Sequence, residues 1–111
     1  MIYHKQVGFP PHFRRPVGRM QLKVSNYARK KSVKRGITIP SHIDFKGLDV
    51  IEVGFDGIRL NHLLVRMTHD DKYDVCIAIV LKNGWALAKT VWLCHNLDHH
   101  STLDSTKYAQ V

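Results

Sequence analysis

The dipeptide Asn83-Gly84 separates two strand-like segments, Tyr73–Leu81 and Trp85–Cys94. Asn-Gly is the favoured sequence for a two-residue hairpin turn, and β-branched, aliphatic and aromatic residues dominate both flanking segments. The sequence therefore predicts a β-hairpin in which residues equidistant from the turn face each other. In that register Cys76 lies opposite Val91, and the very apolar first segment forms the central strand of a sheet.

A helix is predicted upstream of the hairpin, over residues 26–35. Ser25 is a good N-cap, and Gly36 is a typical residue at a helix C-terminus. Tyr27 and Ala28, with Val24 before them, are expected to form a narrow apolar face on this helix.

Two further strand-like segments, Asp49–Gly54 and Ile58–Thr68, lie between the helix and the hairpin. Short polar turns separate them. The pattern predicts an α+β domain in which an N-terminal arm and a basic helix pack on a roughly four-stranded antiparallel β-meander. We assign residues 21–111 to this single domain. Prolines interrupt residues 1–20, which we interpret as an extended basic N-terminal arm.

The length of 111 residues fits one domain. No apolar stretch approaches the roughly 18 residues of a membrane span, and the N-terminus has no hydrophobic signal region. Cys76 and Cys94 both fall in predicted strands but not opposite each other, so we interpret them as reduced, buried thiols. These features predict a cytoplasmic protein that does not associate with a membrane.

The charge of the chain is strongly asymmetric. Residues 1–40 contain ten Lys and Arg and no acid, whereas residues 41–111 contain seven Lys and Arg against nine Asp and Glu. A basic N-terminal third is typical of a polyanion-binding protein, and RNA or the ribosome is the expected partner. The residues predicted to contact nucleic acid are Arg29, Lys30, Lys31, Lys34 and Arg35 of the helix, with Arg14 and Arg15 of the arm. A merely solvated helix face is the alternative, although like charges four residues apart repel and favour a bound anion.

A basic helix followed by four antiparallel strands resembles the RelE-type fold of the barnase, colicin and RelE superfamily of small RNA-cleaving toxins. The stretch with Ser25, Ala28 and Arg35-Gly36-Ile37 is also similar to the S-x-H-A-x-x-R-x-x-x-R-G-I helix of DUF4258-like members. Tyr27 stands where the histidine of that motif is found, so the histidine's role does not carry over.

The C-terminal sequence resembles the ending of small phage and prophage proteins, which run roughly K-T-V-W-L-N, D-x-H-x-T-L-D and then a tyrosine. The matching residues are Lys89, Thr90, Val91, Trp92, Leu93, Asp98, His100, Thr102, Leu103, Asp104 and Tyr108. Cys94 stands where asparagine is usual. The resemblance implies a phage-encoded protein.

Metal-independent RNA cleavage needs proton-transfer groups and cations that stabilise the charged transition state. We predict His100 and His95 as the acid and base, with Lys89 and Arg66 as phosphate-stabilising cations, and no cofactor. Two alternatives stay open. His100 can instead order the C-terminal segment through hydrogen bonds, and Lys89 can extend to the sheet edge as a solvated cation.

A metal site is the competing interpretation, because Cys94, His95, Asp98, His99 and His100 are all potential ligands. Zinc sites normally use two separated ligand pairs, and no second pair has the usual spacing. We therefore predict no metal.

A non-catalytic phage protein that binds a host protein or nucleic acid is the alternative function. Neither predicted sheet face is cleanly polar, so a homodimer in which a second subunit covers one face also fits.

Overall fold

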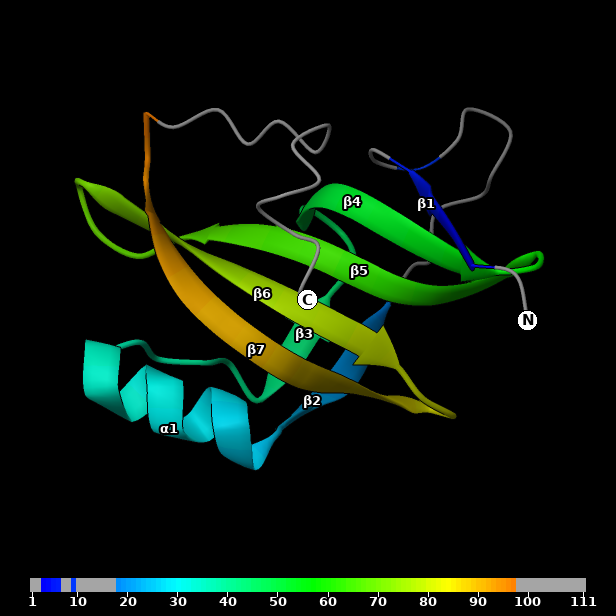
Figure 1. The fold of residues 1–111 in the computed structure, drawn as a ribbon, viewed down its shortest axis with the longest axis horizontal. Helices are drawn as coiled ribbons and strands as arrows, with labels where there is room; N and C mark the ends of the chain where they lie inside the picture. Colours follow the sequence, from blue (N-terminus) through cyan, green and yellow to red (C-terminus); the bar gives the residue numbers. More distant parts are fainter. Residues whose placement is uncertain (1–2, 7–8, 10–17, 98–111) are drawn as a thin grey trace.

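The computed structural model describes residues 3–6, 9 and 18–97 of the chain. Within these residues, seven strands form one curled sheet, and a single ten-residue helix lies beside it (Figure 1). The elements are β1 Tyr3–Gln6, β2 Arg19–Val24, α1 Asn26–Arg35, β3 His42–Asp44, β4 Asp49–Asp56, β5 Arg59–Thr68, β6 Tyr73–Leu81 and β7 Trp85–His95. The α+β class is confirmed. In this part of the chain, no helix is long and apolar enough to cross a membrane.

The sheet is larger than the predicted four strands. Its order is β1-β4-β5-β6-β7-β2-β3, in which β4 to β7 pair antiparallel with their neighbours in sequence. β2 pairs parallel with β7, and β3 pairs antiparallel with β2. β1, in the segment interpreted as an arm, pairs with β4. These extra strands are short and pair with distant segments, so their hydrophobic pattern was weak evidence of their existence.

The helix begins and ends where the sequence predicts. Ser25 Oγ accepts a hydrogen bond from the Ala28 N–H at 3.0 Å, and Gly36 adopts the left-handed conformation at φ 66°. The predicted apolar face is confirmed only for Ala28, which is fully buried, because Val24 is the last residue of β2 and Tyr27 is 60% exposed. Ala28 and Ser32 are the residues that α1 buries where it contacts β7. Their small side chains let the helix approach the strand closely.

A β-bulge interrupts the β6–β7 hairpin at Lys89. Ile79 faces Ala88 as the turn predicts, but Ala78 faces Thr90, which leaves Lys89 as the extra residue. Beyond this point the predicted register is wrong by one residue, so Cys76 faces Trp92 instead of Val91.

The bulge serves as the attachment point of the helix. The N–H of Ser25 donates to the Ala88 carbonyl at 3.0 Å, and its Oγ donates to the Lys89 carbonyl at 2.8 Å. A single serine therefore ends β2, caps α1 and satisfies two carbonyl groups of β7.

The sheet has an inner and an outer face. The inner face holds the main core, in which Ile43 of β3 packs in one cluster with Val53 of β4 and Leu63 of β5. β3 is far from β4 and β5 in the sheet order, but all three strands contribute to this core because the sheet curls around it (Figure 1). The outer face carries a smaller cluster that includes Leu64, Cys76, Ala78 and Cys94.

Candidate functional site

Helix α1 displays its cations to solvent. Arg29, Lys30, Lys34 and Arg35 are exposed, and Lys31 is partly buried with its Nζ 5.2 Å from the Tyr27 ring centroid. Among the residues that the structure describes, no carboxylate lies within ion-pairing distance of these cations. Because like charges on successive turns repel, this surface favours a bound polyanion.

β2 extends the basic surface of the helix. Arg19, Gln21 and Lys23 point to solvent while Leu22 lies in the core, which is the alternation expected of a half-buried strand. Lys23 Nζ lies 4.5 Å from the Trp85 ring centroid, within cation–π range. The two predicted arm contacts, Arg14 and Arg15, lie outside the described residues.

Arg66 is an internal tie between three strands. Its Nε donates to Asp74 Oδ2 at 2.6 Å, and its Nη2 donates to the carbonyls of His95 at 3.1 Å and Asn96 at 3.3 Å. Burial, the largest single effect, would lower the pKa of Arg66, but the hydrogen bond and charge of Asp74, together with the nearby Cys94 and Cys76, outweigh burial and raise this pKa above its usual value. The guanidinium therefore stays charged, with an internal carboxylate as counter-ion.

His95 ends β7 beside Arg66. Its ring is exposed, lies edge-on to the Tyr73 ring at 5.9 Å and accepts a hydrogen bond at Nδ1 from the Leu97 N–H at 3.2 Å. This bond occupies Nδ1, so Nε2 is the remaining proton-transfer atom of the ring. His100, the other predicted proton-transfer residue, lies outside the described residues.

Lys89 does not join Arg66 and His95. It precedes His95 by six residues along β7, a separation of up to about 20 Å at the usual rise per strand residue. Its exposed side chain instead lies near His62 on β5, whose pKa it helps to lower. Of the predicted catalytic residues that the structure describes, Arg66 and His95 thus lie near the end of β7, and Lys89 lies apart from them near His62.

His62 is a residue whose surroundings the sequence analysis missed. It lies on the outer face, because the flanking Leu63 belongs to the inner core and Leu64 to the outer cluster. Burial first, and then the charges of Lys89 and Lys82, lower the pKa of His62 from its ordinary value and so favour the neutral imidazole. The register across β5, β6 and β7 creates this neighbourhood, and only the β6–β7 register near the turn was readable from the sequence.

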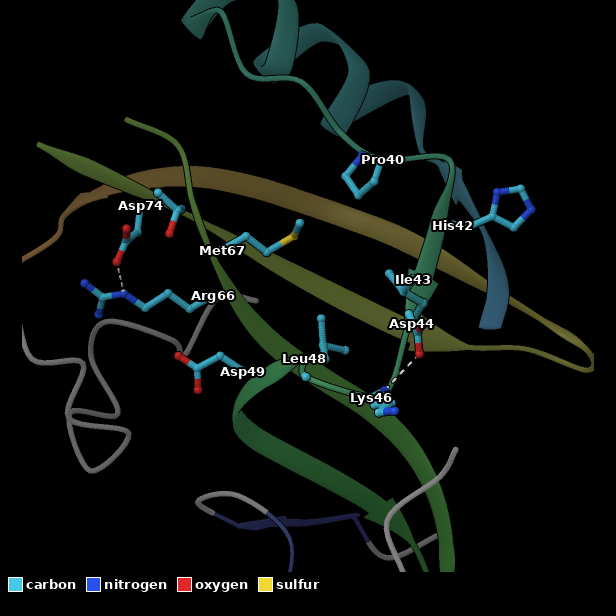
Figure 2. A pocket seen from close by; sticks show the side chains of 12 residues that line it. Pro40, His42, Ile43, Asp44, Lys46, Leu48, Asp49, Arg66, Met67 and Asp74 are labelled. Carbon is cyan, nitrogen blue, oxygen red and sulfur yellow. Dashed lines mark hydrogen bonds and ion pairs between the residues drawn. The ribbon is translucent and has the colours of Figure 1, made fainter. Parts of the chain in front are cut away.

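A pocket of about 490 Å³ opens between β3 with the following connector and the ends of β5 and β6 (Figure 2). Met67, Ile43 and Leu48 provide apolar lining, whereas Arg66 turns toward Asp74 (Figure 2). The rim mixes acidic and basic side chains and differs in this respect from α1. It has the character of a polar cleft and not of a phosphate-binding surface.

The potential metal ligands that the structure describes do not converge. Cys94 is buried, with its Sγ 3.4 Å from Cys76 Sγ, whereas the adjacent His95 is exposed. Neither cysteine forms a disulfide. Successive strand residues point to opposite faces, so Cys94 and His95 cannot share an ion within a regular strand. Asp98, His99 and His100 lie outside the described residues, and in the described ranges no three potential ligands gather.

Comparison with protein-family models, curated proteins and solved structures finds no match to this chain. The geometry of the site is therefore the basis for function. It offers an exposed cationic helix, an arginine bonded to the main chain of a terminal histidine, and a second group of cations on the outer face.

Proposed function

We propose that the protein binds RNA through the basic surface of α1. The observation that carries this proposal is that a well-capped helix presents four exposed cations with no described carboxylate within ion-pairing distance. Phosphates supply the missing counter-charge, and the release of their bound counter-ions supplies much of the affinity. The attachment of Ser25 to the β7 bulge fixes the helix relative to the sheet before RNA binds.

The direct test neutralises the helix. In fluorescence-anisotropy titrations with a labelled RNA, the variant Lys30→Gln, Lys31→Gln, Lys34→Gln should bind roughly tenfold or more weakly than the wild type. The matched control is Lys46→Gln, Arg59→Gln, Lys72→Gln, which removes the same net charge from exposed residues elsewhere.

The control variant should retain most of the affinity, because it removes no helix cation. Equal losses in the two variants would show that overall charge, and not α1, determines binding. Wild-type protein that binds no RNA but captures a host protein would favour the non-catalytic host-binding alternative.

Metal-independent RNA cleavage, as in RelE-like toxins, is the second candidate function. The exposed His95 at the end of β7 favours it, since a histidine can transfer the protons of 2′-hydroxyl attack. The order of a basic helix followed by the β4–β7 strands supports the proposed RelE-like meander. In this proposal His95 and His100 act as proton-transfer residues.

Cleavage of labelled total RNA, or of RNA on translating ribosomes, tests this candidate. Activity should persist in EDTA and disappear in His95→Ala or His100→Ala protein that retains its RNA affinity. Intact RNA in all samples, together with salt-sensitive binding, would leave a binding protein without nuclease activity.

A further inference from the structure

Side chains of four neighbouring strands form a platform on the outer face near the β6–β7 turn. Val80 of β6 faces Leu87 of β7, and His62 of β5 faces Val80. On the other side of β7, Lys23 pairs with Leu87 and Gln21 pairs with Trp85. Directly paired residues project to the same face. His62, Val80, Leu87 and Lys23 therefore form a continuous row across four strands, and the pair of Trp85 and Gln21 lies beside it.

Aromatic and aliphatic groups occupy the centre of this platform. Trp85, Leu87 and Val80 are all partly exposed, and they lie opposite the buried inner-core residues Ala86 and Ile79. An indole ring at the surface of a sheet offers a flat apolar surface to a planar ligand.

Cations surround this centre. Lys23 extends over the Trp85 ring, and the charges of Lys82 and Lys89 both reach His62. Their effect on the pKa of His62 indicates that Lys82, just beyond the end of β6, and Lys89, at the bulge of β7, both lie close to this histidine. All three lysines are exposed.

No described carboxylate forms an ion pair with these three lysines. Asp74 is at the other end of β6 and pairs with Arg66, and Glu52 is buried on β4. Lys82 and Lys89 make no ion pair with any residue that the structure describes. The platform therefore combines a stacking surface with cations, as single-stranded nucleic-acid sites do.

We propose that this platform binds unpaired nucleotides of RNA, with a base taking the place of the Lys23 ammonium over the Trp85 ring and adjacent phosphates paired with Lys23, Lys82 and Lys89. This inference rests on the RNA binding proposed above and adds its substrate class. Duplex RNA offers phosphates to α1 but keeps its bases stacked inside the RNA double helix, where they cannot reach Trp85. The platform therefore selects single strands.

The test compares a labelled single-stranded RNA with a duplex of the same length by fluorescence anisotropy. Trp85→Leu should weaken single-strand binding by about 5- to 150-fold, the effect of losing one stacked base. It should leave duplex binding unchanged. Trp85→Phe, which keeps an aromatic surface, should retain most of the single-strand affinity. A parallel titration with single-stranded DNA of the same sequence shows whether the ribose 2′-hydroxyl groups contribute to binding.

The outcomes separate this inference from the proposed function. If Trp85→Leu changes neither affinity, or lowers both equally, the platform proposal is wrong, and binding that still depends on α1 preserves the proposed function. If wild-type protein binds neither RNA, the proposed function fails and takes this inference with it. If Trp85→Leu unfolds the protein, the double variant Lys82→Gln, Lys89→Gln replaces it in the test. An unchanged single-strand affinity in this double variant would overturn the proposal.

Discussion

Replacing Arg66 with methionine tests whether this arginine is a structural tie or a free phosphate ligand. The substitution keeps an unbranched side chain of similar length but removes the ion pair with Asp74 and the hydrogen bonds to the carbonyls of His95 and Asn96. It leaves the Asp74 carboxylate, whose side chain is 17% exposed, without its cationic partner.

The expected loss follows from burial. Breaking one side of a buried ion pair costs about 3–5 kcal/mol. The Arg66 and Asp74 side chains are 11% and 17% exposed, so solvent screens part of the charge and the lower limit of about 3 kcal/mol applies. With an unfolding entropy of about 2.1 cal/mol/K per residue, a chain of this length should lose about 13 °C in Tm.

Thermal unfolding followed by circular dichroism measures this loss, with Arg59→Met as the matched control because Arg59 is an exposed arginine on the same strand. The double variant Arg66→Met, Asp74→Leu should recover much of the stability, because removing both charges leaves no unpaired ion. A loss no larger than that of Arg59→Met would refute the structural assignment and leave the guanidinium available for phosphate.

Other parts of the structure make predictions that are equally direct. Ser25→Ala removes a helix cap and the hydrogen bond to the β7 bulge, and should lower the free energy of unfolding by about 2 kcal/mol in urea titrations. NMR titration should give His62 a pKa below the ordinary value of 6.5, and Lys89→Gln should raise this pKa again. Because the fold disfavours protonated His62, the stability that depends on its neutral form is complete above pH 6.5 and declines as the pH falls below that value. An unchanged pKa in Lys89→Gln would contradict the proximity of these residues. Burial and the neighbouring Cys94 thiol raise the pKa of Cys76, so Cys76 and Cys94 should resist iodoacetamide at pH 8 in the folded protein and react in guanidinium, as mass spectrometry would show.

Local signals in the sequence predicted the local structure well. Ser25 and Gly36 define both ends of α1 because capping depends on a few adjacent residues. Asn83-Gly84 likewise fixes the hairpin register as far as Ile79 and Ala88. Beyond these residues the register depends on the bulge at Lys89, whose carbonyl group bonds to Ser25, 64 residues away in the sequence.

Non-local structure was the part that sequence patterns missed. The parallel pairing of β2 with β7 and the three-residue strand β3 leave little trace in hydrophobic periodicity. The same limit applies to the site. Composition identified the cations of α1, but the neighbourhood of His62 and Lys89 depends on the pairing of three strands, and Arg66 gave no sequence sign of its partner Asp74.

The salt dependence of RNA binding tests the central claim most directly. For a single strand, the slope of log K against log salt concentration is about −0.7 for each phosphate contact. Neutralising Lys30, Lys31 and Lys34 should therefore make the slope shallower by about 2, while the Lys46, Arg59 and Lys72 control leaves it unchanged. A slope that is the same in the wild type and the helix variant would contradict phosphate binding by α1.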